Sequence, residues 1–203
     1  MNSDKMIKKI GIVITDGVGF RNFILSNFIT EASLAFDSVT IYSGLPKSVY
    51  KTFLPPTIEI KELEVFTEPK LTWFFRKWKE VAHLRRNQDF YGMKDNLVSG
   101  YPKNNSARSI LVKLIYGFTN LIHSNGSISV AEKLQFLSFS KYKIVNNYLN
   151  LLDKDHQTHL FFTHQRPPFL APFLYAAQKL KIKTSSFIFS WDNLASKGRM
   201  ASN

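Results

Sequence analysis

Three short segments, far apart in the chain, contain residue types that can do chemistry. They are Asp16-Gly17-Val18-Gly19, His164-Gln165-Arg166 and Trp191-Asp192-Asn193. Together they offer two carboxylates, an imidazole, a guanidinium and a glycine loop. A carboxylate or an imidazole can accept the proton of a hydroxyl group, and cations and backbone N–H groups nearby can neutralise a departing phosphate. The predicted chemistry is group transfer from a phosphate-bearing donor to a hydroxyl.

Individual side chains receive roles on this basis. The candidate catalytic residues are Asp16, His164 and Asp192. The candidate substrate-binding residues are Gly17, Gly19, Arg21, Asn22, Arg166, Trp191, Asn193 and Lys197. A purely structural role stays open for each, because aspartate favours turns and histidine can bond a backbone carbonyl. No metal is expected, since alternation sends His159 and His164 to opposite faces of one strand.

Each segment follows a run that predicts a β-strand. Residues 10–14 form an apolar run without polar alternation, which is typical of a parallel strand covered on both faces, and we expect it at the centre of a sheet. Residues 158–164 and 184–190 predict the strands before the other two segments, and 38–43 predicts a further strand. Residues 57–61 alternate strictly and predict an edge strand. Parallel strands end at one sheet edge, where ligands bind, so the three segments should meet.

Helical patterns fill most of the remaining chain. They cover 22–35, 69–87, 107–122, 129–152 and a segment with Pro172 in its first turn. Residues 88–106 are polar and predict a long loop. We expect 107–122 and 129–152 to form an α-hairpin over one side of the sheet. The predicted fold class is α/β, a single Rossmann-like domain over 1–203 with a parallel sheet, flanking helices and this inserted hairpin.

Composition narrows the classes of protein. The 203 residues contain no cysteine, which excludes disulfides, thiolate metal sites and cysteine nucleophiles. No apolar stretch is long enough to cross a bilayer, and we expect a cytoplasmic protein. Lys and Arg number 27 against 15 Asp and Glu, a net charge of +12. That excess favours anionic partners, namely nucleic acid, acidic lipid headgroups or phosphorylated substrates.

The predicted helix 69–87 is the most basic one. Trp73, Arg76, Lys77 and Lys79 are its candidate membrane-surface residues, since a basic amphipathic helix with aromatic side chains can lie on an anionic membrane. This would place the protein at the inner membrane face. The alternative is an ordinary helix with a core-facing stripe and a solvated outer face.

Residues 13–22, together with 163–166 and 187–194, resemble the N-terminal half of bacterial GT-B-type glycosyltransferases of surface-polysaccharide biosynthesis. The resemblance implies two Rossmann-like domains, of which the first holds the sugar acceptor and the second binds a nucleotide sugar, with no further cofactor. It also implies that 16–20 faces the cleft between them. On this expectation the chain is an acceptor-side domain cut before the donor-binding domain, half of a GT-B fold, and is inactive alone.

Two other functions stay open. The first is a non-catalytic basic α/β module that binds nucleic acid or an acidic partner, although no RNP-like strand or helix-turn-helix spacing is present and nucleic acid is not expected. The second is a sugar-nucleotide epimerase-like enzyme. A dinucleotide cofactor is not supported, because Gly17 and Gly19 lack the third glycine of the fingerprint and no acidic residue closes the second strand.

Overall fold

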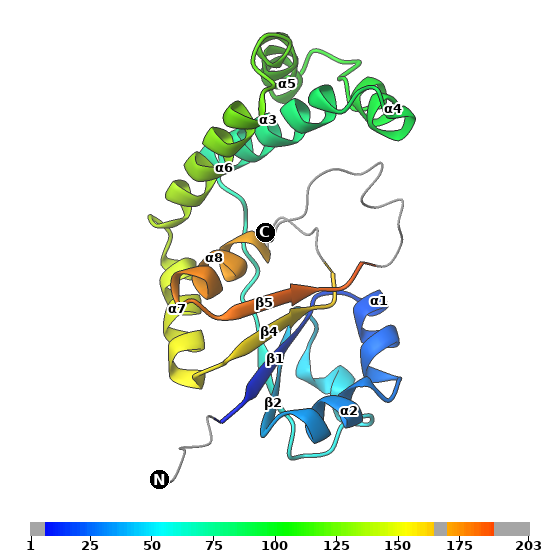
Figure 1. Ribbon diagram of the computed structural model, residues 1–203, viewed down its shortest axis with the longest axis vertical. Coiled ribbons are helices and arrows are strands. Elements are labelled where there is room, and N and C mark those ends of the chain that lie inside the picture. Colours follow the sequence, from blue (N-terminus) through cyan, green and yellow to red (C-terminus); the bar gives the residue numbers. More distant parts are fainter. Residues whose placement is uncertain (1–6, 165–169, 189–203) are drawn as a thin grey trace. The chain divides into compact units, whose positions relative to one another are not determined.

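The computed structural model describes residues 7–164 and 170–188 (Figure 1). Their contacts divide the chain into two compact units, where the sequence predicts one domain. The sheet unit contains residues 7–67, 143–164 and 170–187. The helical unit contains residues 68–142 and, of the described residues, also Ile188.

The sheet unit is built on five parallel strands. They are β1 (Lys9–Ile14), β2 (Ser38–Ser43), β3 (Glu59–Glu62), β4 (His159–Phe162) and β5 (Lys183–Ser186). Their order is β3-β2-β1-β4-β5, and every neighbouring pair is parallel. The predicted α/β, Rossmann-like class is confirmed, with β1 at the centre and β3 at an edge.

One face of the sheet is covered by the chain that follows β1 and β2. It forms α1 (Gly17–Gly19), the π-helical turn η1 (Phe20–Ile24), α2 (Phe28–Ala35) and the 3-10 turn η2 (Lys47–Tyr50). The prediction of one helix over 22–35 is wrong, because the helix breaks at residues 25–27. There the Ser26 hydroxyl accepts a hydrogen bond from Phe28 N at 3.3 Å, and such local bonds compete with helical ones.

The other face is covered by α7 (Lys143–Asp155) and α8 (Ala171–Lys179), which lie opposite α2 in Figure 1. Leu160 and Phe162 of β4 pack there in one cluster with Leu152 of α7 and Phe173 of α8. Pro172 lies in the first turn of α8, as predicted, because that position needs no backbone N–H donor.

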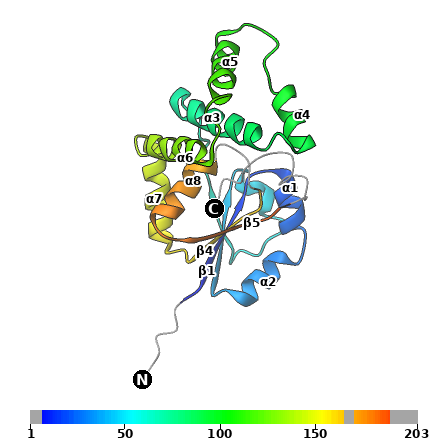
Figure 2. The same cartoon turned by 45° about the horizontal axis from the view of Figure 1, so that its top comes forward.

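The helical unit consists of α3 (Lys70–Arg86), α4 (Tyr91–Ser99), α5 (Ala107–Thr119) and α6 (Asn125–Phe139). The other three helices all pack on α3, and α5 crosses it, as Figure 2 shows. Its core is formed by Val81, Leu97, Val112, Ile115 and Tyr116.

Two predictions for this region are wrong, one of a loop and one of a helix. Residues 88–106 are not a loop throughout, because α4 forms and buries Met93 and Leu97, which lie one turn apart on the same helix face. The predicted helix over 129–152 is two helices, α6 and α7, and α6 begins earlier because the Ser124 hydroxyl accepts from Ser127 N at 3.2 Å. The predicted hairpin over the sheet is therefore replaced: α5 and α6 belong to the helical unit, and α7 covers the sheet.

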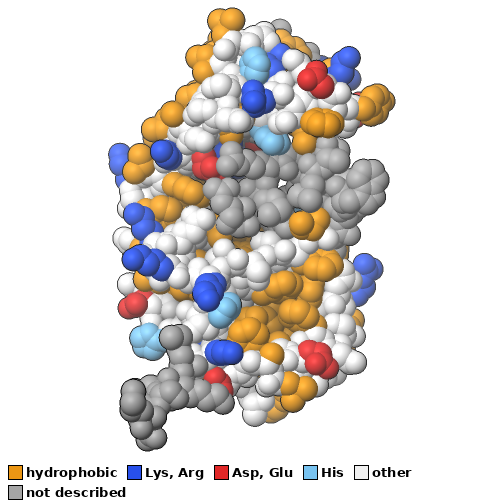
Figure 3. Space-filling view, in the orientation of Figure 1, with side chains coloured by type: hydrophobic (Ala, Val, Ile, Leu, Met, Phe, Trp, Pro, Cys, Tyr) orange, Lys and Arg blue, Asp and Glu red, His pale blue; other side chains and the backbone are white. Residues whose placement is uncertain are grey.

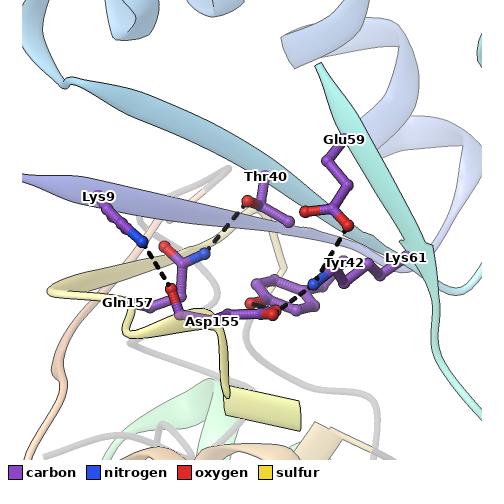
Figure 4. A network of polar contacts seen from close by, with 7 residues as sticks. All are labelled: Lys9, Thr40, Tyr42, Glu59, Lys61, Asp155 and Gln157. Atoms are coloured by element: carbon purple, nitrogen blue, oxygen red, sulfur yellow. Dashed lines mark hydrogen bonds and ion pairs between the residues drawn. The ribbon is translucent and has the colours of Figure 1, made fainter. Parts of the chain in front are cut away.

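A polar network fastens the end of α7 to the sheet (Figure 4). We call it the Asp155 network; its members are Lys9, Thr40, Tyr42, Glu59, Lys61, Asp155 and Gln157. The Tyr42 hydroxyl donates to Asp155 Oδ2 at 2.5 Å, and Lys61 forms an ion pair with the other carboxylate oxygen. Gln157 Nε2 donates to Thr40 Oγ1 at 3.2 Å. The network holds the turn from α7 into β4 against β2 and β3.

Gly11 makes room for this network. A Cβ atom at Gly11 would collide with Leu160 and with the ring of Tyr42. The tyrosine ring crosses β1 at this point, where Gly11 lies between Thr40 and Leu160 in the sheet register. A side chain on the central strand would therefore displace the ring that reaches Asp155.

Burial raises the pKa of Tyr42 far above its ordinary value, and the hydrogen bond to Asp155 and the charge of Asp155 raise it further. Burial opposes the charge of Lys61, but the bond and ion pair with Asp155 outweigh it, so the pKa of Lys61 is also raised. Both groups keep their protons in the native state at a pH where the unfolded chain loses them. Their contribution to stability is complete below about pH 10 and declines as the pH rises above it.

We therefore expect the free energy of unfolding to fall steeply above about pH 10. In Tyr42→Phe the fall should be shallower by up to about 1.4 kcal/mol per pH unit, because one buried phenol no longer contributes. Urea unfolding followed by circular dichroism over a pH series measures the difference. The control is Tyr91→Phe, whose side chain is 86% exposed. An identical slope in wild type and Tyr42→Phe would contradict the role given to Tyr42.

Arg76 is the most strongly held cation of α3. Its Nε and Nη2 donate to the two oxygens of Glu68, each at 2.7 Å, and its Nη1 donates to Glu80 at 2.5 Å. The side chains of Arg76 and Glu68 are 18% and 14% exposed. A planar guanidinium suits this two-pronged geometry, whereas an ammonium group does not.

Replacing Arg76 should therefore destabilise the helical unit, and alanine should do so more than lysine. We expect Arg76→Lys to lower the free energy of unfolding by about 1–2 kcal/mol, since the charge stays and the forked contact is lost. Arg76→Ala should cost about 3 kcal/mol, because it leaves the carboxylate of Glu68 mostly buried and without its cation. Chemical unfolding measures both, with the exposed Arg86→Ala as the control. Equal stability of Arg76→Lys and wild type would show that the fork contributes nothing.

Candidate functional site

The candidate site lies at the carboxyl edge of the sheet, between β1 and β4. β2 and β3 follow β1 in sequence and lie on one side of it in the sheet, whereas β4 and β5 lie on its other side. Such a change of direction opens a crevice at the strand ends, and ligands of open parallel sheets bind there. The segments that follow the two strands are residues 15–20 and 163–164, which we call the switch-point loops.

The structure confirms that Asp16 and His164 lie at the same sheet edge. β1 and β4 are parallel neighbours with Val13 level with Phe162, so both chains leave the sheet together. His164 is half-buried directly beyond β4. Two of the three predicted segments thus supply one rim, and the third, 191–193, lies outside the described residues.

Asp16 has a structural role in this rim. Its Oδ1 accepts a hydrogen bond from Gly19 N at 2.7 Å, so it caps α1, and its carbonyl accepts from Phe20 N at 3.0 Å. Within the described chain, Oδ2 has no hydrogen bond. Asp16 therefore combines the turn-forming role, which the sequence left open, with one carboxylate oxygen that remains available for a ligand.

Gly19 brings the two switch-point loops into contact. A Cβ atom there would lie 2.5 Å from Thr163 Oγ1, at the end of β4. Thr163 is fully buried, and its N and Oγ1 donate to the Val13 carbonyl at 3.1 and 2.8 Å. Gly19 is thus needed for close approach to β4, and Thr163, which sequence reasoning missed, is the residue that it approaches.

Gly17 has a different environment. It is exposed, and a Cβ atom there would meet nothing within 4 Å. Neither Gly17 nor Gly19 has a positive φ, so the turn itself does not require glycine. Arg21 and Asn22 follow on η1 and are both exposed, with Arg21 Nε donating to Asn22 Oδ1 at 3.4 Å. Gly17, Arg21 and Asn22 therefore line the rim on its solvent side.

Thr15 is a second residue that sequence reasoning missed. It is 8% exposed, and its Oγ1 is a buried atom without a hydrogen-bond partner in the described chain. Gly44, directly after β2, passes close to Thr15, because a Cβ atom added to Gly44 would lie 3.3 Å from Thr15 Cα. Buried hydroxyls are usually paired, so an orphan at a strand end is a group that a ligand can satisfy. The available signal was a threonine placed directly after an apolar strand.

The remaining predicted site residues are not part of this geometry. Arg166, Trp191, Asp192, Asn193 and Lys197 lie outside the described residues, so their roles stay predictions. His159 lies on the face of β4 opposite Leu160 and Phe162, and its ring stacks edge-on with Phe36 at 5.6 Å. Burial and the charges of Lys183 and Lys8 lower the pKa of His159. Among residues 7–164 and 170–188 no three His, Asp or Glu side chains gather as a metal site.

The predicted membrane-surface residues lie on α3 and have partners within the helical unit. Arg76 pairs with Glu68 and Glu80, Lys77 also pairs with Glu80, at 3.7 Å, and Lys79 pairs with Glu132 at 3.5 Å. Trp73 is half-buried, and the guanidinium of Arg108 lies 5.0 Å from its ring centre. These cations bind acidic groups of their own unit. Over the part of the chain that the structure describes, no helix is long and apolar enough to cross a membrane.

The Asp155 network also gathers ionisable groups with a perturbed tyrosine, a pattern found at active sites. Tyr42 is fully buried, however, and the Asp155 side chain is 7% exposed. Asp155 ends α7, next to the beginning of β4 rather than its carboxyl end. The tyrosine and the carboxylate at its centre are therefore closed to a substrate, and the geometry of the network fits a structural role.

The two glycines of the first loop provide a matched test of this geometry. We expect Gly19→Ala to destabilise the protein by about 1–3 kcal/mol, because the new methyl group collides with Thr163. Gly17→Ala has open space and an ordinary backbone conformation, so it should be neutral or stabilising by up to about 1 kcal/mol. Urea unfolding of the two variants measures the difference. Similar stability of both variants would show that the loops are not in contact.

Comparison with known proteins adds no relative: no protein-family model matches the chain, and no curated protein or solved structure is significantly similar to it.

Proposed function

We propose that the sheet unit is the acceptor-binding half of a glycosyltransferase, which passes a sugar from a nucleotide-sugar donor to a polysaccharide or lipid-linked acceptor. The observation that supports this proposal is the meeting of the two switch-point loops at one sheet edge. A carboxylate, an imidazole and an unpaired hydroxyl, from Asp16, His164 and Thr15, lie at the carboxyl ends of neighbouring parallel strands.

The chemistry requires a base beside the acceptor. Asp16 or His164 accepts the proton of an acceptor hydroxyl while that oxygen forms a bond to the anomeric carbon of the donor sugar. The bond from this carbon to the phosphate oxygen breaks, and the nucleoside diphosphate leaves with the electron pair. Arg166 and Lys197 are the cations that the sequence offers for its negative charge.

Asp16 and His164 are positioned in different ways. One oxygen of Asp16 is engaged by Gly19 N, which leaves the other oxygen for the acceptor. His164 follows Thr163, whose two bonds to Val13 fix the backbone just before it. Both groups are therefore held by the ends of rigid strands, as precise positioning requires.

Binding experiments can separate the functional and structural roles of Asp16. Asparagine keeps the helix cap but removes the charge, whereas alanine removes both and should cost about 1 kcal/mol of stability. We expect ¹⁵N-labelled protein to show amide shifts at 15–20 and 163–164 when neutral and acidic oligosaccharides are added. Asp16→Asn should weaken this binding without loss of stability, and His164→Ala should weaken it as well.

The exposed Leu34→Ser serves as the control and should bind like wild type, since Leu34 lies on α2 and is 79% exposed. Titration with UDP, GDP and CDP tests which substrate the site holds. Shifts of the switch-point loops with these nucleotides, and none with the saccharides, would assign the edge to the donor and overturn the acceptor role. No shift at the loops with any probe would leave the transferase proposal without support from this site.

A further inference from the structure

α5 exposes an apolar face away from the helices that it contacts. This face consists of residues that follow one another at alternating steps of three and four, namely Ala107, Ile110, Leu114, Gly117 and Leu121. Leu121 lies in the turn after the helix. Ile110, Leu114 and Leu121 are 50%, 61% and 89% exposed. The inward face of α5 is apolar too, with Val112 and Ile115 in the core of the helical unit. A helix that is apolar on both sides is typical of one that is covered on both sides.

The exposed apolar surface continues along α6. Val130 and Leu137, seven residues apart on one helix face, are 48% and 65% exposed. Lys133 lies between them on the same stripe, and Lys141 follows just beyond the helix; both are exposed. In Figure 3 apolar side chains gather along the upper left margin, over α5 and α6. We call this surface the α5–α6 face.

The charge of the helical unit complements an anionic partner. Residues 68–142 contain twelve Lys and Arg against five Asp and Glu. Three of the five acids, Glu68, Glu80 and Glu132, are already paired with cations of α3. α5 contains Arg108 and Lys113 and no acid. Most of the cationic excess is therefore left outside the ion pairs of α3.

We infer that the α5–α6 face binds the surface of an anionic phospholipid bilayer. Its leucine, isoleucine and valine side chains enter the boundary between headgroups and acyl chains, and the adjacent lysines contact the phosphates. A second copy of the chain suits this face less well. Pairing two α5 helices would bring their cations together, and α5 contains no acidic residue to neutralise them. The inference does not depend on the transferase proposal. It also differs from binding through α3, where Arg76, Lys77 and Lys79 are paired with acids.

Vesicle flotation with the purified chain tests the inference directly. We expect binding to vesicles of phosphatidylcholine with phosphatidylglycerol, weaker binding at high salt and little binding to phosphatidylcholine alone. Leu114→Ser with Leu121→Ser should reduce the partition coefficient at least about tenfold, because two exposed anchors are lost. Lys133→Glu with Lys141→Glu should reduce it at least about fivefold.

The matched apolar control is Leu34→Ser with Val65→Ser, two side chains of the sheet unit that are 79% and 84% exposed. The charge control is Lys51→Glu with Lys154→Glu, two exposed lysines of the sheet unit. All these positions are exposed, so circular dichroism should show unchanged folding. Equal binding to both vesicle types, or equal loss in the control variants, overturns the inference. So does a dimer in light scattering that Leu114→Ser with Leu121→Ser dissociates, since the face then binds a second copy.

Discussion

The sheet unit depends on the burial of β1 between β2 and β4. A strand that is hydrogen-bonded on both edges and packed on both faces has no solvent-exposed side, so both its faces must be apolar or small. Ile10, Ile12 and Ile14 fill one face, while Gly11 and Val13 occupy the other. Since all neighbours are parallel to β1, every strand end on its carboxyl side points to the same rim. The shared rim of Asp16 and His164 follows from that arrangement.

The two faces of β1 are used in different ways. The isoleucine face packs against the chain of η1 and α2 and is apolar throughout. The glycine face admits the Tyr42 ring, which reaches across the strand to the carboxylate of Asp155. Removing the carboxylate of Asp155 from water costs free energy, so its charge needs partners inside the protein. Lys61 and Tyr42 meet that need, and the end of α7 is fixed to the sheet as a result.

α3 shows that the cations of a basic helix can be paired in the folded protein. In the sequence of α3, Glu80 is the single acidic residue among many cations, so most of these cations have no acidic neighbour within the helix. In the folded unit Glu68 and Glu132 approach from outside the helix and bind Arg76 and Lys79. Three cations of α3 are thus paired, two of them with acids from outside the helix and Lys77 with Glu80 of α3 itself. α5 and α6, which pack on α3 with their inward faces, also expose apolar side chains on their outward faces.

The sequence alone determined the α/β class, the central place of the run 10–14, the edge strand near 57–61 and the shared edge of Asp16 and His164. These features follow from periodicity and from the direction of parallel strands, which are local or topological properties. Only the tertiary structure decided which contacts those residues make. That Gly19 is needed for Thr163 rather than for a turn, that Thr15 is left without a partner, and that the cations of α3 meet Glu68 and Glu132 all depend on side chains distant in the chain. No local pattern contains those distances, because they are set by packing.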